Sequence, residues 1–364
     1  MHYATQAHEG YSDETIVEFG GISVAHPQAR RRVTLESIAK EAGVSLSTVS
    51  KVLNGRADVS SATRAEVEQH LSRHGYHRRR QTLSSTALLE LVVHELEPGF
   101  SLEIIKGVQD VARAAGLGLV LSETGTRYAP GEEWIAGVLR RRPRGVVLLF
   151  ADLADDLRAQ LRAREIPFVV IDPAGDPSPD VPSISSANWS GGLMATRHLI
   201  EQGHTRIAAI TGPQGMMCSL ARVDGFRSAL TAAGLKVDEK LIRYGDFHLD
   251  GGRTQGAALL DLPNPPTAIF AGSDLQALGV YESARARGIS IPRDLSVVGY
   301  DDIPIAAWIS PALTTVHQPL RRMGEEAARV VLRAAAGTLD GVPRMDLATS
   351  LVVRHSTAPP ASAA

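Results

Sequence analysis

Cysteine is almost absent from this chain of 364 residues, because Cys218 is the only one. A single thiol excludes an intrachain disulfide framework, and the neighbouring Met216 and Met217 indicate a packing role. No apolar run reaches the roughly 18 residues of a membrane-spanning helix. The N-terminus also lacks the basic segment and apolar stretch of a secretory signal. We therefore expect a cytoplasmic protein without a membrane partner.

Sequence motifs of several enzyme classes are missing as well. The chain contains no G-x-G-x-x-G after an expected strand and no G-x-x-x-x-G-K-[ST], the two loops that bind nucleotide phosphates. It contains no H-E-x-x-H zinc motif and no G-x-S-x-G nucleophile elbow. The twelve histidines are scattered without the spacing of a metal site. We expect no catalytic residue, no cofactor and no metal.

The charge is distributed unevenly along the chain. The net charge is −2 overall, but residues 1–29 carry four acids and no Lys or Arg. Residues 30–80 carry eleven Lys and Arg against five Asp and Glu. A basic module on a mildly acidic body is typical of a protein that contacts nucleic acid at one end only. The length leaves room for two or three domains.

The basic region predicts three short helices between Val33 and Tyr76. Thr34, Ser45 and Ser60 stand where each helix needs an N-cap, and Gly43 permits the left-handed turn that ends the first helix. Helix, tight turn, helix is the layout that places its second helix in the major groove of DNA. A three-helix bundle with a solvated polar face is the alternative interpretation.

The second of these helices has two unlike sides. Val49, Val52 and Leu53 make one side apolar. The other side is mostly small and hydroxyl-bearing, as close approach to a phosphate backbone requires. This feature and the local positive charge favour DNA binding over a plain three-helix bundle.

From Leu88 onward, short apolar runs alternate with amphipathic helical patterns. Examples are the runs at 207–211 and 268–271 and the helical pattern near 219–233. This alternation predicts parallel sheets covered on both faces. Two such series indicate two α/β lobes with a cleft between them, and ligands of open α/β sheets bind beyond the carboxyl ends of the strands.

The order of residues resembles the lac repressor (LacI/GalR) family along most of the chain after Val33. The helical region reads V-T-L-x-x-I-A-x-x-A-G-V-S-x-x-T-V-S-K-V-L-N. Later motifs that look like the family's core are N-x-x-G-G from Asn188, R-x-x-G-F from Arg222, S-D-x-x-A-x-G from Ser273 and V-V-G-Y-D-D from Val297. The resemblance implies an N-terminal all-α helix-turn-helix headpiece. It also implies an α/β two-lobed core of doubly wound parallel sheets, similar to periplasmic sugar-binding proteins.

The expected domains follow from these patterns. They are a disordered extension at 1–32, a helix-turn-helix domain at 33–77, a linker at 78–87, a two-lobed core at 88–356 and a disordered tail at 357–364. The tail has no leucine heptads, so we expect a homodimer.

The linker departs from the family pattern, because Arg78-Arg79 replaces the usual Pro-Asn. Only Leu83 remains there as an apolar residue that could insert into the minor groove.

The resemblance also assigns site residues. Those expected on DNA, reading bases or lying near phosphates, are Thr34, Ser45, Leu46, Ser47, Thr48, Ser50, Lys51, Asn54, Arg78 and Arg79. The residues expected on a small effector follow from their places near the carboxyl ends of the expected strands, and the resemblance places Arg222 at the same cleft. They are Phe100, Ser122, Asn188, Arg222, Phe247, Ser273 and Asp301. Two of these have plainer interpretations, since Asp301 would also suit a turn cap and Phe247 the core.

The function that this pattern predicts is sequence-specific transcription regulation, most simply repression. The partners would be a palindromic double-stranded operator, a second copy of the chain and a small effector, expected to be a sugar in the cleft. Two alternatives stay open on the residues alone. One is a sugar receptor, and the other is an α/β enzyme with an appended helical domain. Ligand titration monitored by DNA binding separates the three.

Overall fold

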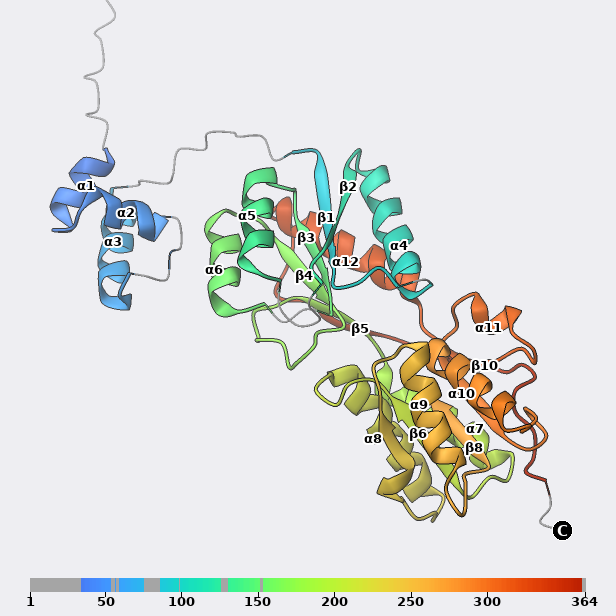
Figure 1. Ribbon diagram of the computed structural model, residues 1–364. Coiled ribbons are helices and arrows are strands. Elements are labelled where there is room, and N and C mark those ends of the chain that lie inside the picture. The colour runs from blue at the N-terminus through green and yellow to red at the C-terminus, as the bar shows by residue number, and fades with distance from the viewer. Residues whose placement is uncertain are drawn as a thin grey trace, which may run out of the picture.

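The computed structural model describes residues 34–53, 56, 59–74, 86–97, 99–125, 130–150 and 153–361, which form a helical headpiece and two α/β lobes (Figure 1). The headpiece helices are α1 (Leu35–Glu41), α2 (Leu46–Leu53) and α3 (Ser61–Arg73). The three expected N-caps are confirmed, because the hydroxyl oxygens of Thr34, Ser45 and Ser60 accept hydrogen bonds from backbone N–H groups in the first helical turns. Asn54, Arg78, Arg79 and Leu83 lie outside the described residues.

The first lobe is a six-stranded parallel sheet with helices on both faces. Its strand order is β11-β5-β4-β3-β1-β2. The strands are β1 (Leu88–Val93), β2 (Gly118–Glu123), β3 (Val146–Leu149), β4 (Phe168–Ile171), β5 (Ser183–Ser186) and β11 (Arg344–Leu347). The helices are α4 (Phe100–Ala114), α5 (Glu132–Arg141), α6 (Asp155–Ala163) and α12 (Leu320–Ala335). Strands β1, β3 and β4 are almost wholly buried, as expected for a sheet covered on both faces.

The second lobe repeats this plan. Its strand order is β12-β10-β9-β8-β6-β7, and only β12 runs antiparallel to its neighbour. The strands are β6 (Ile207–Thr211), β7 (Ile242–Tyr244), β8 (Ala268–Ala271), β9 (Ser296–Asp301), β10 (Thr314–His317) and β12 (Ser350–Val352). The helices are α7 (Asn188–Glu201), α8 (Met217–Ala232), α9 (Leu249–Leu260), α10 (Asp274–Ala286), α11 (Ile305–Trp308) and the 3-10 turn η1 (Glu239–Leu241). The expected two-lobed α/β fold is confirmed.

Two departures from the sequence-based expectation concern segments without an apolar pattern. Strands β5 and β11 have the sequences SISS and RMDL, which carry too few apolar residues to predict a strand. The described part of the 357–364 segment is also not a free tail. Thr357 Oγ1 lies 2.9 Å from His198 Nε2, and the Ala358 carbonyl accepts a hydrogen bond from Ser296 Oγ at 3.0 Å. These hydrogen bonds are long-range, so a local pattern could not reveal them. Among the described residues, no helix is both long and apolar enough to cross a membrane.

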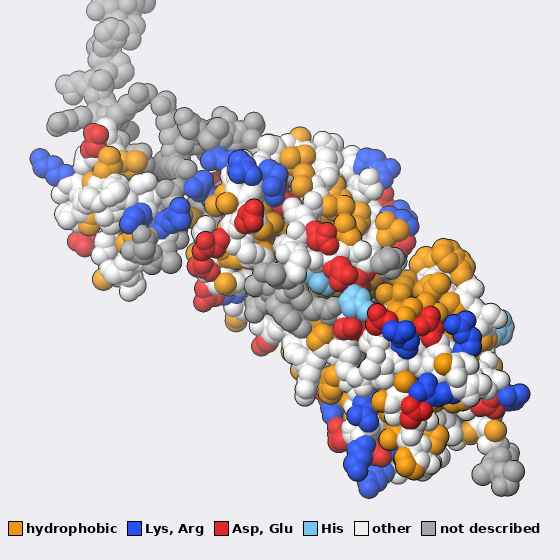
Figure 2. Space-filling model, viewed as in Figure 1, with side chains coloured by type: hydrophobic (Ala, Val, Ile, Leu, Met, Phe, Trp, Pro, Cys, Tyr) orange, Lys and Arg blue, Asp and Glu red, His pale blue; other side chains and the backbone are white. Residues whose placement is uncertain are grey.

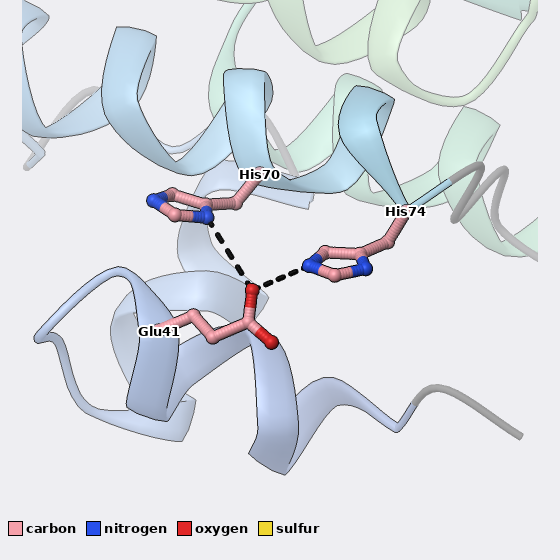
Figure 3. Close-up of side chains that lie close together, drawn as sticks. All are labelled: Glu41, His70 and His74. Atoms are coloured by element: carbon pink, nitrogen blue, oxygen red, sulfur yellow. Dashed lines mark hydrogen bonds and ion pairs between the residues drawn. The ribbon is translucent and has the colours of Figure 1, made fainter. Parts of the chain in front are cut away.

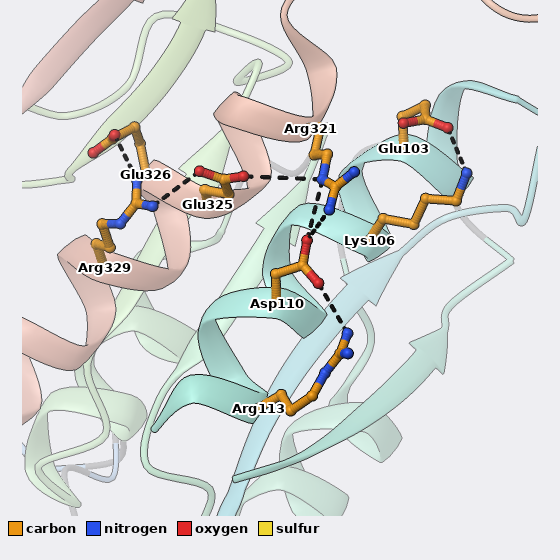
Figure 4. A network of polar contacts seen from close by, with 8 residues as sticks. All are labelled: Glu103, Lys106, Asp110, Arg113, Arg321, Glu325, Glu326 and Arg329. Atoms are coloured by element: carbon orange, nitrogen blue, oxygen red, sulfur yellow. Dashed lines mark hydrogen bonds and ion pairs between the residues drawn. The ribbon is translucent and has the colours of Figure 1, made fainter. Parts of the chain in front are cut away.

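Helices α4 and α12 pack in very close contact on one face of the first lobe. A Cβ atom at Gly107 would lie 1.9 Å from the Arg321 carbonyl oxygen, and one at Gly324 would lie 2.4 Å from the Ile104 carbonyl oxygen. Figure 4 shows the polar network along this seam, in which Arg321 contacts Asp110. Exposed ion pairs contribute little to stability, so the close backbone approach is the stronger determinant of the packing.

Replacing Gly107 by alanine should therefore destabilise the first lobe. The methyl group would force α4 away from α12, and overpacking of this kind costs about 1–3 kcal/mol, with more where backbone blocks relaxation. Urea unfolding monitored by circular dichroism measures the loss. Gly215→Ala is the matched control, because a Cβ atom there meets nothing within 4 Å. Equal stability of the two variants would contradict the proposed packing constraint.

Candidate functional site

A cavity lies between the lobes, beyond the carboxyl ends of their strands. The cavity and the solvent at its open mouth together span about 480 Å³. The first lobe contributes His94, Glu97, Phe100 and Phe150, and the second contributes Met216, Cys218, Arg222, Phe247, Ser273, Leu275, Asp301 and Ile303. A mostly apolar lining with a few polar groups is typical of small-molecule sites. Of the seven expected effector residues, the structure brings together Phe100, Arg222, Phe247, Ser273 and Asp301 at this cavity.

Arg222 is buried at the cavity, with an exposed fraction of only 3%, and several neighbours hold its side chain. Its Nε donates to Asn188 Oδ1 at 2.8 Å, and its Nη1 donates to the Gly272 carbonyl. The guanidinium carbon lies 3.8 Å from the ring centre of Tyr300 and 5.3 Å from that of Phe247. These contacts compensate the desolvation of the cation. They leave Nη2 without a hydrogen bond to any described residue, so this donor is available to a ligand.

The position of Arg222 depends on glycines at the crossing of α7 and α8. A Cβ atom at Gly192 would lie 2.2 Å from the Arg222 carbonyl oxygen, and one at Gly225 would lie 2.1 Å from the Trp189 carbonyl oxygen. The two helices therefore approach closely enough for Asn188, at the start of α7, to reach the Arg222 side chain. Asn188 does not line the cavity itself, so its place is that of a support for Arg222.

Asp301 stands at the end of β9 in the second lobe. It is buried, its φ angle is 117°, and its Oδ1 accepts a hydrogen bond from Gln318 Nε2 at 2.6 Å. Gln318 Oε1 in turn accepts from Ser186 Oγ of β5 at 2.6 Å. Because β5 belongs to the first lobe and β9 to the second, this relay connects the lobes at their hinge. Burial raises the pKa of Asp301 to about 7, although Arg222 and Gln318 oppose the rise.

The remaining expected residues of the cavity are positioned by backbone contacts. Ser273 N-caps α10 by accepting from Gln276 N at 3.0 Å, and its hydroxyl donates to the Phe247 carbonyl at 2.7 Å. This hydrogen bond holds Phe247, whose φ is 71°, with its ring so close to Gly212 that a Cβ atom there would lie 2.0 Å from it. Ser273 therefore holds the loop that contains Phe247. Its hydroxyl group already donates its hydrogen bond to the Phe247 carbonyl.

Ser122 is a correction to the expected effector residues. It does not line the cavity, and its Oγ donates instead to Glu90 Oε1 at 2.7 Å. Glu90 is fully buried and is paired with Arg141 Nη2 at 2.6 Å and with Trp134 Nε1 at 3.2 Å. The strand end alone suggested Ser122, but its side chain turns to Glu90 of the neighbouring strand β1.

Some residues at the cavity, and others where the two lobes meet, were not among the expected effector contacts. Phe150 follows β3 and stacks on Phe100, with ring centres 5.3 Å apart and planes at 20°. His248 of the second lobe approaches two acids of the first, since its Nε2 is 3.5 Å from Glu95 Oε2 and its Nδ1 is 3.3 Å from Glu97 Oε1. Figure 2 shows histidine and acidic side chains gathered where the lobes meet. The sequence places these residues after strands, which is a local signal of a site. Only the arrangement of the two lobes brings His248 close to Glu95 and Glu97.

The headpiece has a second candidate site on the outer face of α2. Leu46, Ser47, Ser50 and Lys51 are exposed there, whereas Val49 and Val52 are buried on the inner face. Ser45 caps the helix, and its Oγ lies 2.7 Å from Ser47 Oγ and 2.8 Å from Thr48 Oγ1. Thr34 is exposed at the start of α1. An exposed helix with small polar side chains and one lysine has the shape and chemistry of a recognition helix.

Two family models match parts of the chain that include the headpiece site and the second-lobe residues of the cavity. "Bacterial regulatory proteins, lacI family" matches residues 34–79, and "Periplasmic binding protein-like domain" matches residues 196–357. The HTH-type transcriptional regulator CelR of Thermobifida fusca is 39% identical over 90% of this chain and 99% of its own length. Among solved structures, the CelR–cellobiose complex has a TM-score of 0.69 at 38% identity, covering 89% of this chain and all of that one. The lac repressor dimer bound to operator and the anti-inducer ONPF has a TM-score of 0.65 at 27% identity, covering 90% of this chain and all of that one.

The fold and the two sites define a transcription regulator that binds DNA through a helix-turn-helix and carries a ligand-binding core, and it is not an enzyme. The chain belongs to the LacI family of bacterial regulatory proteins.

The raised pKa of Asp301 predicts a pH dependence of stability. Its ordinary value is 3.8 and its folded value is about 7, so between these the native state holds a proton that the unfolded state releases. The free energy of unfolding should therefore decrease as pH rises through this window. In Asp301→Asn the free energy of unfolding should depend less steeply on pH, with a slope smaller by up to about 1.4 kcal/mol per pH unit. Because Asp301 also raises the pKa of the buried Asp274, the difference reports both groups.

Urea unfolding of both proteins at several pH values from 4 to 8 measures this difference. Asp340→Asn, which changes an exposed carboxyl group, is the control and should follow wild type. A slope for Asp301→Asn that is equal to the wild-type slope would show that Asp301 is already ionised at low pH.

Proposed function

We propose that the protein is a homodimeric repressor whose operator affinity is controlled by a sugar bound in the interlobe cavity. The observation that carries this proposal is the buried guanidinium of Arg222, which lines the cavity close to the rings of Tyr300 and Phe247 and whose Nη2 donates to no described residue. The N–H groups of Nη2 can donate to hydroxyl groups of a sugar ring, while apolar faces cover its C–H groups. Phe100, Phe150 and Phe247 supply such faces. The solved relative with cellobiose makes this disaccharide the first ligand to test, and ribose, found in a less similar relative, the second.

The hinge relay gives this ligand a route to the DNA-binding headpiece. A ligand that contacts Arg222 and Asp301 of the second lobe and Phe100 of the first binds best at one lobe angle. Asp301 is also joined through Gln318 to Ser186 of the first lobe, so its contacts bear on that angle. The headpiece precedes the first lobe in the chain, and a change of lobe angle in a dimer would alter the headpiece spacing.

The proposed dimer follows from the operator geometry of helix-turn-helix proteins. Two headpieces of a dimer, spaced by one turn of the DNA helix, bind the two half-sites of a palindromic operator. The lac repressor, to which this chain is similar along most of its length, binds its operator as a dimer. A regulator of this family shares the compartment of its DNA, which in bacteria is the cytoplasm.

The first prediction tests the cavity. Arg222→Ala should bind operator but lose the sugar response, because a charged hydrogen bond in the cavity is removed. The loss should be about 1.5–3 kcal/mol of ligand affinity, roughly 10- to 150-fold. Arg222→Lys keeps the positive charge but loses the planar guanidinium. Its ligand affinity should therefore lie between those of wild type and Arg222→Ala. Calorimetric titration of cellobiose, with and without operator, gives both the affinity and the coupling.

Ser122→Ala is the matched control, because Ser122 lies outside the cavity and should leave the ligand affinity unchanged. Coupling is reciprocal, so operator must change sugar affinity by the factor by which sugar changes operator affinity. Sugar affinity that is equal with and without operator would exclude the ligand-controlled switch. An unchanged response of Arg222→Ala would exclude this cavity as its site.

The second prediction tests the exposed face of α2. Lys51→Ala should relax the preference at one symmetric base pair, at about 1–3 kcal/mol per half-site. Ser45→Ala should weaken binding to all sequences alike, because Ser45 is an N-cap near the phosphates. Selection from random oligonucleotides measures both effects. Lys40→Ala, on the exposed side of α1, is the control for loss of charge alone. If Lys51→Ala has the same base preference as the control, Lys51 does not contribute to base recognition.

A further inference from the structure

Three side chains with metal-binding atoms lie close together within the headpiece, on α1 and at the end of α3. They lie away from the exposed face of α2. Figure 3 shows the imidazoles of His70 and His74 on α3 pointing towards the Glu41 carboxylate at the end of α1. His74 Nε2 contacts Glu41 Oε2 directly, and His70 Nδ1 lies 3.7 Å from the same oxygen. One ligand atom from each of the three lies within 4.8 Å of the other two.

The geometry of the helices accounts for this convergence. Residues four apart on a helix lie one above the other on one face, so His70 and His74 present a pair of nitrogens. The packing of α1 against α3 through Ile38, Val67 and Leu71 brings Glu41 opposite this pair. The sequence alone predicted no metal, because the two histidines have a common spacing and Glu41 belongs to another helix.

The hydrogen bonding within the cluster is incomplete. His70 Nδ1 is buried and forms no hydrogen bond with any described residue, and 3.7 Å is too long for one with Glu41. A buried polar nitrogen without a partner is unfavourable.

We propose that Glu41, His70 and His74 bind a divalent transition-metal ion of the Zn²⁺ class and thereby join α1 to α3. Two imidazoles and one carboxylate are ligands that suit Zn²⁺, and water would fill the fourth position. Zn–N bonds of about 2.0–2.1 Å place tetrahedral ligand atoms about 3.3 Å apart, so small side-chain rotations suffice. The ion would take the place of the direct contact between His74 and Glu41 and would provide the missing partner for His70 Nδ1.

The consequence would be a headpiece whose stability depends on metal. An ion that binds only the folded headpiece stabilises it by mass action. The site lies on α1 and α3, so metal should extend the temperature range of operator binding without changing base preference. This metal site is independent of which effector the cavity binds.

The test uses Co²⁺ as a spectroscopic probe with the full-length chain. We expect one Co²⁺ ion per chain to give visible absorption that Zn²⁺ displaces and that is lost in both His70→Gln and His74→Gln. Loss of a direct ligand should weaken affinity more than the roughly 10- to 100-fold seen when a residue supporting a ligand is lost. Glu41→Gln should weaken binding as well. All three variants should bind operator in EDTA as wild type does, which shows that they fold.

Two controls separate this site from other histidines. His355→Gln changes an exposed histidine, and Glu95→Gln changes a second group of possible ligands, formed with His94 and Glu97. Both should retain the Co²⁺ spectrum and the gain in operator binding at raised temperature with Zn²⁺. The proposal is overturned if wild type shows no Co²⁺ absorption at micromolar metal, if the absorption survives in both headpiece variants, or if only Glu95→Gln abolishes it.

Discussion

The buried guanidinium of Arg222 is the constraint on which the second lobe and its cavity depend. A cation removed from water is very unfavourable unless its surroundings compensate it. Here the compensation comes from Asn188 Oδ1, the Gly272 carbonyl and the faces of Tyr300 and Phe247, each from a different segment of the second lobe. These segments must therefore meet at one point, and the glycine contacts between α7 and α8 allow them to do so. The same guanidinium belongs to a residue that lines the cavity.

The cavity and the hinge share Asp301, so the lining of the cavity is connected to the relative position of the lobes. Its carboxylate lines the cavity and accepts a hydrogen bond from Gln318, which in turn accepts from Ser186 in the first lobe. All three side chains are buried, so each hydrogen bond is costly to break without a replacement. Such a relay favours discrete lobe arrangements over continuous bending, which is the property that a ligand-controlled switch needs.

Much of the fold could be predicted from local pattern because its elements are regular. The caps at Thr34, Ser45 and Ser60 and the apolar side of α2 are local features, and they were confirmed as predicted. The buried strands of both sheets are continuous apolar runs, so they too were evident. Strands β5 and β11 were not, because their residues are polar and their pairing depends on partners far along the chain. The contacts of Thr357 and Ala358 with the second lobe are of the same long-range kind.

The sequence by itself determined the class of regulator, the two-lobed core and the importance of Arg222, since each rests on a motif of consecutive or regularly spaced residues. Only the tertiary structure decided that Ser122 turns to Glu90 instead of the cavity, that Phe150 stacks on Phe100, and that Glu41 meets His70 and His74. The physical reason is that these contacts join different elements. Their geometry is set by how helices and strands pack, and spacing within one element carries no information about it.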